Sequence, residues 1–281
     1  MYNINSTIQL RNGTHIPLFG LGTFQSESGN VCKNAVLTAL QQGYRLIDTA
    51  ILYGNESDVG DAIIESNIPR EEIFVVTKLH IEMHGKKNAV SQLKESLKRL
   101  KLDYVDLYLI HSPTGGSIIN TWKGMIECKE LGLTKVIGVS NFGVNQLEGM
   151  KQFNIEMPEV NQIELHVWLQ QKDCVEWCRK ENIAIMGYCP LAKTHLFGKT
   201  PIYDISKEIG KTEAQIAIRW SIESGIITIP KSVNPIRIKE NADVFDFNLE
   251  NKYNYIFTHC NCKYKSSVSV NHMYISWNEI K

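Results

Sequence analysis

Four polar side chains suited to proton transfer stand at, or just after, the ends of short apolar runs. In chain order they are Asp48, Tyr53, Lys78 and His111. A parallel α/β fold keeps its chemistry at the carboxyl ends of its strands, where side chains from neighbouring strands meet. Each residue alone would more often be a packing or solvated side chain, but four in equivalent places favour function. We therefore predict that they form one site.

The residue types predict acid catalysis at a carbonyl oxygen. A free phenol has a pKa of about 10, too high for easy proton exchange at neutral pH. A nearby cation lowers a phenol pKa, and Lys78 can be that cation for Tyr53. Asp48 can hold Lys78 through a charge-assisted bond, and His111 can donate a hydrogen bond to a substrate carbonyl. We predict that Tyr53 is the general acid.

The attacking group is not supplied by any of these four side chains. No serine or cysteine stands at a nucleophile elbow, and no zinc-binding spacing is visible. The group His259, Cys260, Cys262 and His272 fits no zinc site either, so we predict no metal. The attacking species would then come from a cofactor, and hydride is the obvious candidate.

Composition favours a globular protein without nucleic-acid or membrane partners. The 281 residues include 30 basic and 30 acidic side chains, so no net charge attracts either partner. The N-terminus lacks a secretory pattern, and no apolar run has the length of a membrane span. The seven scattered cysteines suggest no disulfide framework. We expect a cytoplasmic protein.

The chain alternates between short apolar runs and longer segments with helical spacing. The runs predicted as strands are 18–21, 45–47, 73–77, 104–110, 135–139, 159–163, 184–188 and 226–229. The predicted helices are 31–42, 57–66, 87–100, 119–131, 145–152, 171–181, 205–224 and 236–245. Eight strands and eight helices in strict alternation require a parallel sheet with right-handed crossovers.

This count predicts an α/β protein with the (β/α)8 TIM-barrel fold. The alternative is an open doubly wound sheet, but Gly20-Leu21-Gly22 is only half of a dinucleotide-binding turn. Before the barrel, Asn12-Gly13 predicts an N-terminal β-hairpin with a two-residue turn. We predict a single domain over 1–281. The tail from about 250 to 281 shows no helical period and is predicted to be irregular or poorly ordered.

The order of several motifs resembles the aldo-keto reductases, NADPH-dependent (β/α)8 enzymes, from residue 7 to about 249. The motifs are GLGTF (20–24), YRLIDTAILYGNE (44–56), VVTKL (75–79), DLYLIHSP (106–113), IGVSNF (137–142), VNQIELH (160–166), GYCPL (187–191) and IPKS (229–232). The catalytic tetrad of that family falls on the four residues already selected. Short loops after His111 and Tyr188 resemble the branch that contains prostaglandin F synthase and diketogluconate reductase.

The resemblance implies NADPH as the cofactor and indicates where it binds. In the family, the nicotinamide half is contacted by positions that match Thr23, Ser140, Asn141, Gln162 and Tyr188. The phosphate and adenine contacts match Lys231, Ser232, Arg237, Glu240 and Asn241. Gly22 and Leu191 lie in the same motifs and are predicted to contact the cofactor too. By themselves Lys231 and Arg237 would be a solvated basic patch, but beside a helix start they can form an anion site.

Departures from the family concern the substrate. Phe24, His111 and Ser112 are predicted to contact it, and many relatives have tryptophan in place of Phe24 and Ser112. His80 likewise replaces a tryptophan that is common after the lysine strand. The tail matches neither the final helix nor the covering loop of the relatives.

Three functions remain open. The first is reduction of a small-molecule aldehyde or ketone to an alcohol by a monomeric, NADPH-dependent oxidoreductase with Tyr53 as general acid. The alternative is a regulatory or inactive family member that binds a nicotinamide cofactor, because the C-terminus is altered. A remote third is a barrel glycosidase that pairs Glu164 with Asp48. His111 argues against steroid double-bond reduction, for which the family uses glutamate.

Overall fold

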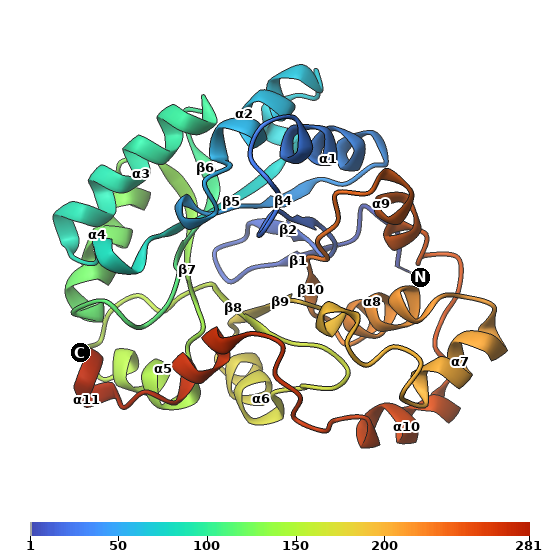
Figure 1. The fold of residues 1–281 in the computed structure, drawn as a ribbon. Coiled ribbons are helices and arrows are strands. Elements are labelled where there is room, and N and C mark those ends of the chain that lie inside the picture. The colour runs from blue at the N-terminus through green and yellow to red at the C-terminus, as the bar shows by residue number, and fades with distance from the viewer. Residues whose placement is uncertain (1) are drawn as a thin grey trace.

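The computed structural model describes residues 2–281, and its centre is a parallel sheet of eight strands (Figure 1). The strands are β3 (Leu21–Gly22), β4 (Leu46–Asp48), β5 (Phe74–Leu79), β6 (Val105–Ile110), β7 (Thr134–Ser140), β8 (Val160–Glu164), β9 (Ala184–Tyr188) and β10 (Ile227–Thr228). They pair in chain order. Parallel bridges from Phe19 to Thr228 and from Gly22 to Lys231 join the first strand to the last. The predicted (β/α)8 barrel is confirmed.

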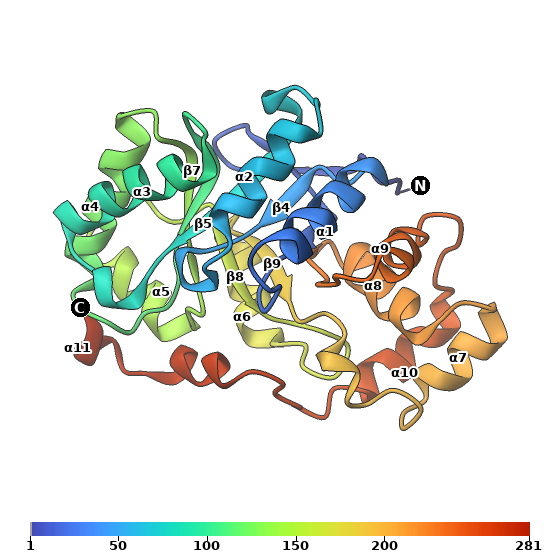
Figure 2. The same ribbon diagram turned by 45° about the horizontal axis from the view of Figure 1, so that its top comes forward.

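Helices surround the strands (Figures 1 and 2). They are α1 (Asn30–Gln41), α2 (Glu56–Glu65), α3 (Lys86–Leu100), α4 (Ile118–Glu130), α5 (Val144–Lys151), α6 (Lys172–Lys180), α7 (Ile202–Ile209), α8 (Glu213–Glu223), α9 (Pro235–Ala242), α10 (Asn254–His259) and α11 (Trp277–Ile280). Short 3-10 helices are η1 (Ile51–Tyr53), η2 (Arg70–Glu72), η3 (Ile81–Met83), η4 (Ala192–Thr194), η5 (Asn251–Tyr253) and η6 (Val268–Tyr274). None of the helices in residues 2–281 combines the length and hydropathy that a membrane span requires.

The central strands are buried on both faces. Every residue of β5 and of β6 is buried, because the barrel interior covers one face and the helices cover the other. Helix α8 is buried on nearly every side, whereas the other outer helices leave one face exposed. In α3, for example, Ala89, Leu93, Leu97 and Leu100 face the core at helical spacing. Mostly apolar strands and helices with one apolar face explain why the alternation of strands and helices can be recognised in the sequence.

One predicted helix is two helices. The segment 205–224 divides into the end of α7 and the whole of α8. Gly210 ends α7 in the left-handed conformation, with φ 75°. Thr212 then caps α8, and its hydroxyl and the Gln215 side chain form a capping box. The prediction of one long helix was wrong because it overlooked two signals, the glycine that ends α7 and the threonine that caps α8.

The N-terminal hairpin is present, but its turn is longer than predicted. Strands β1 (Thr7–Gln9) and β2 (His15–Pro17) pair antiparallel. The Leu10 amide donates to the Thr14 carbonyl at 2.8 Å, and the Gly13 amide donates to the Leu10 carbonyl at 2.9 Å. Gly13 has φ 88°, which fits a three-residue loop ending in a left-handed glycine. The two-residue turn was therefore wrong.

The tail after Leu249 packs along the outside of the barrel. Figures 1 and 2 show it running from α10 past α6 to α5, where the C-terminus lies. Four of its buried side chains are Val270, Met273, Trp277 and Ile280. These side chains do not share one helix, because Ile275 and Ser276 between η6 and α11 have extended backbone. The expectation of an atypical, poorly ordered tail stays a prediction.

Candidate active site

Asp48, Lys78 and Tyr53 form a connected group where β4 and β5 end. The Lys78 ammonium donates to both Asp48 carboxylate oxygens, at 2.7 and 2.8 Å, and to the Tyr53 hydroxyl at 3.1 Å. It also donates to the Thr49 carbonyl at 2.9 Å. Lys78 and Asp48 are almost completely buried. The predicted proximity of the phenol and the amine is therefore present.

A buried amide supports the segment that carries Tyr53. Asn55 is fully buried and follows η1. Its Nδ2 donates to the carbonyls of Thr23 and Ser26, at 3.0 and 3.3 Å, and its Oδ1 accepts from the Thr49 hydroxyl at 2.9 Å. The sequence analysis did not single out Asn55. It lies in the same YGNE motif, but nothing in the sequence shows that its side chain points inward.

His111 and Phe24 flank the Tyr53 ring. The His111 ring lies edge-on to Tyr53 at a centroid distance of 5.6 Å, and the Phe24 ring lies at 5.0 Å. Phe24 is 46% exposed, so an apolar group remains available to a substrate there. The His111 carbonyl accepts a hydrogen bond from Asn141 at 3.0 Å.

The pKa of Tyr53 shifts in the direction opposite to the sequence prediction. Burial raises it well above the usual value for a phenol, and the Asp48 carboxylate raises it further. Asp48 binds Lys78 on both oxygens, so little of the ammonium charge is left to stabilise a phenolate. Tyr53 therefore keeps its proton at neutral pH. Burial also lowers the pKa of Lys78, against the influence of Asp48.

His111 is a neutral imidazole at physiological pH. Burial, with repulsion from Lys78, lowers its pKa to about 3. A neutral ring donates one hydrogen bond and adds no second positive charge to the site. The site thus holds a protonated phenol and a neutral imidazole beside an ion pair.

A second group of predicted residues adjoins the first. Gln162 donates to Asp48 at 2.7 Å, and the Ser140 hydroxyl donates to the Gln162 carbonyl at 2.9 Å. The Tyr188 hydroxyl donates to the side chain of Asn141 at 2.8 Å. The Asn141 amide also donates to the Ser140 hydroxyl at 3.1 Å, so the bond from Gln162 to Asp48 joins these residues and the first group in one hydrogen-bond network.

A basic group lies where β10 leads into α9. Lys231 and Arg237 are exposed, and within residues 2–281 neither has a carboxylate within 4.0 Å. Ser232 is buried beside them. Asn234 caps α9 by accepting from the amides of Ile236 and Arg237, at 2.9 and 3.2 Å. Because the cap uses these amides, an anion here would be held chiefly by side chains.

The remaining predicted cofactor residues differ in whether their side chains already have a hydrogen-bond partner in the protein. Gly22 pairs with Lys231, and a Cβ added there would lie 3.0 Å from the Ile229 carbonyl. Leu191 is half-buried just before η4, and Asn241 is buried in α9. Thr23 is committed, since its hydroxyl donates to the Asp48 carbonyl at 2.9 Å. Glu240 accepts from Thr212 at 2.7 Å.

The donor set fits NADPH. One end offers amide and hydroxyl groups next to the phenol, as a nicotinamide carboxamide needs. The other end offers Lys231 and Arg237 at the start of a helix, and within residues 2–281 neither cation has a carboxylate partner, as phosphates need. Gly22 lies between the two ends, where an added Cβ would be only 3.0 Å from the Ile229 carbonyl oxygen.

Glu164 does not form a carboxylate pair with Asp48. It is fully buried and accepts from the amide and hydroxyl of Ser266, both at 2.6 Å, and from the amide of Ser267 at 2.9 Å. His166 lies 3.1 Å from it. Since the tail uses the carboxylate, the geometry gives the glycosidase alternative no support. Within residues 2–281, no three His, Cys, Asp or Glu side chains are placed to hold a metal.

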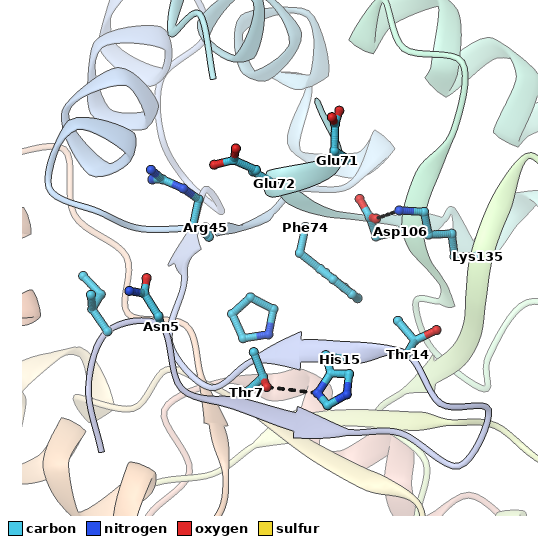
Figure 3. Close-up of a pocket in the computed structure, with 12 residues that line it drawn as sticks. Asn5, Thr7, Thr14, His15, Arg45, Glu71, Glu72, Phe74, Asp106 and Lys135 are labelled. Carbon is cyan, nitrogen blue, oxygen red and sulfur yellow. Dashed lines mark hydrogen bonds and ion pairs between the residues drawn. The ribbon is translucent and has the colours of Figure 1, made fainter. Parts of the chain in front are cut away.

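A separate cavity of about 480 Å³ lies at the amino ends of the strands (Figure 3). Phe74 lies between the hairpin and the start of the sheet there. Several polar groups around it are paired: Asp106 binds Lys135 at 2.9 Å, Thr7 binds His15 at 3.1 Å, and Arg45 donates to two backbone carbonyls. The lining includes none of the predicted site residues, so this cavity is not the candidate active site.

Comparisons with known proteins agree with the geometry. The sequence model of the Aldo/keto reductase family matches residues 18–201. Glyoxal reductase of Bacillus subtilis is 40% identical over 247 residues, covering 88% of this chain and 90% of that protein. Methylglyoxal reductase DkgA of Escherichia coli K12 is 43% identical over 249 residues, covering 87% and 90%.

A solved structure extends the likeness to nearly the whole chain. The aldo-keto reductase of the silkworm Bombyx mori in complex with NADP has a TM-score of 0.87 and 34% identity, covering 97% of this chain and 98% of that one. The family and fold implied by the motifs are thus confirmed, while the branch within the family stays a prediction. This chain belongs to the aldo/keto reductase family of oxidoreductases.

Proposed function

We propose that this protein is an NADPH-dependent reductase that converts aldehydes or ketones to alcohols. The observation that carries the proposal is the Tyr53 hydroxyl, 3.1 Å from Lys78 and beside the ring of His111, in a chain of this family. When bound, NADPH supplies a hydride to the carbonyl carbon. The residues of this chain must then hold the carbonyl, protonate its oxygen and keep the cofactor in place.

Tyr53 donates the proton in this proposal. Its raised pKa favours the acid over the phenolate, so the proton is present when substrate arrives. Lys78 fixes the position of the phenol oxygen and favours its negative charge as the proton leaves. Asp48 holds Lys78, and His111 donates a hydrogen bond to the carbonyl oxygen. In the product, the hydride is on carbon and the Tyr53 proton is on oxygen.

The cofactor is held in two places. Ser140, Asn141 and Gln162 hydrogen-bond the carboxamide, and Tyr188 stacks on the nicotinamide ring. Gly22, Thr23 and Leu191 contribute nearby contacts, although the Thr23 hydroxyl is committed to a backbone carbonyl. Lys231, Ser232 and Arg237 bind the phosphates, and Glu240 and Asn241 border the adenine. Lys231 and Arg237, which have no carboxylate partner within residues 2–281, support NADPH over NADH, because a 2′-phosphate adds negative charge.

Small carbonyl compounds are the proposed substrates. The two relatives named above act on glyoxal and methylglyoxal by their names. We further propose that the protein works as a cytoplasmic monomer. Sedimentation of the purified chain checks the monomer, and fractionation of the source cells checks the location.

Replacement of Tyr53 by phenylalanine tests the proposal. We expect kcat for methylglyoxal to fall by about 100-fold to 10,000-fold, the range for loss of a general acid. NADPH binding, measured by quenching of protein fluorescence, should stay within about threefold, because the phenol oxygen is not a cofactor ligand in this proposal. An unchanged kcat would rule out Tyr53 as the acid.

The same measurements separate the alternative. A wild-type chain that quenches with NADPH but reduces no aldehyde, dicarbonyl, aldose or quinone would be a cofactor-binding member without turnover. A chain that does neither would reject both functions.

A further inference from the structure

The tail is attached to the barrel by two buried polar side chains, Glu164 and Gln146. Glu164, at the end of β8, accepts three hydrogen bonds from Ser266 and Ser267. Gln146, in α5, donates to the carbonyls of His272 and Ile275, at 2.7 and 3.0 Å. A buried carboxylate and a buried amide thus hold the residues on both sides of η6.

Two glycines let the tail approach the barrel closely. A Cβ on Gly143 would lie 2.2 Å from the Met273 carbonyl oxygen, and one on Gly149 would lie 2.1 Å from the Trp277 ring. The Trp277 amide also donates to the Asn145 side chain at 3.0 Å. The tail therefore has a specific seat on α5, and its side chains have defined positions.

This seat brings His272 to the active site. Its Nδ1 lies 2.8 Å from the hydroxyl of Ser112, the residue that directly follows His111. His272 is half-buried, and within residues 2–281 its Nε2 has no hydrogen-bond partner. It lies close enough to His111 to contribute to the low pKa of that ring. The small Ser112 leaves room for the imidazole.

We propose that His272 determines substrate specificity by hydrogen-bonding a second oxygen of the substrate, close to the carbonyl that is reduced. The preferred substrates are then dicarbonyls and hydroxyaldehydes rather than simple aldehydes. This inference rests on the proposed reductase function and adds a residue and a substrate class to it.

The chemistry follows from the hydrogen bond at Nδ1. In this proposal the Ser112 hydroxyl accepts from the Thr114 amide at 3.3 Å and from the Thr114 hydroxyl at 3.0 Å, so its own proton is donated to Nδ1. An imidazole that accepts at Nδ1 carries its proton on Nε2, which then donates. In this proposal His111 donates a hydrogen bond to the oxygen of the carbonyl that is reduced. His272, which contacts the residue after His111, donates one to an oxygen on the adjoining carbon. A simple aldehyde has no group for this donor.

Methylglyoxal and propanal test the inference, because they share a three-carbon skeleton and differ in the second oxygen. The purified full chain is assayed with NADPH for kcat and KM on both. We expect His272→Phe to lower kcat/KM for methylglyoxal by about fivefold to tenfold, as for one neutral hydrogen bond, mostly through KM. Propanal should lose less than about threefold on the same scale.

Three further variants make the result specific. His272→Gln keeps an amide donor and should recover most of the methylglyoxal activity. Ser112→Ala frees Nδ1 and should reproduce the selective loss. His259→Phe, the same change at an exposed position of the tail, should alter neither substrate.

Equal losses on both substrates, or no loss on methylglyoxal, would overturn the role of His272 while the reductase function stands. A wild-type chain that reduces neither compound would overturn this inference, and one that also reduces no other aldehyde, aldose or quinone would overturn the reductase function. If His272→Phe does not fold, Ser112→Ala decides: a loss confined to methylglyoxal supports the inference, and an equal loss rejects it.

Discussion

At the scale of single residues, the candidate active site contains a buried ion pair, Lys78 and Asp48, whose ammonium group also binds Tyr53. Lys78 donates to Asp48, to the Thr49 carbonyl and to Tyr53, so all three protons of its ammonium group are used. Gln162 donates to the same carboxylate. A buried charge with complete hydrogen bonding is tolerated, whereas one without a partner is costly.

Removal of one partner of this pair should therefore destabilise the protein more than removal of both. We expect Lys78→Met to lower the free energy of unfolding by about 3–5 kcal/mol, because it leaves Asp48 charged and buried. Asp48→Asn combined with Lys78→Met should cost less than Lys78→Met alone. Urea unfolding of the three proteins measures this. A double variant at least as unstable as Lys78→Met would contradict it.

At the scale of elements, helix α5 carries the seat of the tail. Its glycine at 149 faces the Trp277 ring, and its Gln146 binds two tail carbonyls. In an isolated helix, alanine would be better than glycine by about 1 kcal/mol. Here the added methyl group would collide with an indole ring, and tertiary packing outweighs propensity.

Gly149→Ala should therefore release the tail without unfolding the barrel. We expect faster proteolytic cleavage after residue 260 and an almost unchanged melting temperature, because the tail opens locally. Gln152→Ala, an exposed change at the end of the same helix, is the matched control. Equal cleavage rates in both variants would mean that the glycine does not hold the tail.

At the scale of the whole molecule, buried histidines couple stability to pH. The pKa of His111 falls from about 6.5, its ordinary value, to about 3 on folding, and burial also lowers the pKa of His84. Between pH 6.5 and pH 3, His111 is protonated in the unfolded chain and neutral in the folded chain. Stability is therefore complete above pH 6.5 and falls as the pH drops towards 3.

This linkage can be measured by urea unfolding between pH 7 and pH 4. Each such histidine contributes a slope of at most about 1.4 kcal/mol per pH unit. His111→Phe keeps a ring against Tyr53 and should reduce the slope by up to that amount. His259→Phe makes the same change at an exposed position. If both variants kept the wild-type slope, His111 would not be the group responsible.

Sequence patterns were enough to predict the barrel and the proximity of Asp48, Tyr53 and Lys78. Strands such as 104–110 can be recognised because burial on both faces favours apolar side chains, and the one buried acid there, Asp106, is paired with Arg70 and Lys135. Asp48, Lys78 and His111 were found because parallel strands bring their ends to one edge. Local backbone detail was less legible, as the turn at Gly13 and the break at Gly210 show.

The interactions between the side chains could not be predicted from the sequence, because they depend on distances in the folded chain. The direction of the Tyr53 pKa depends on whether burial or the Lys78 charge prevails, and that balance requires distances. Whether Asn55 lies at the surface or is buried beneath the segment that carries Tyr53 depends only on its neighbours in the fold. The partners Ser112 and His272 lie 160 residues apart, and no local pattern links them. Spacing along a chain reports which face a residue lies on, whereas charge, burial and partners belong to the folded molecule.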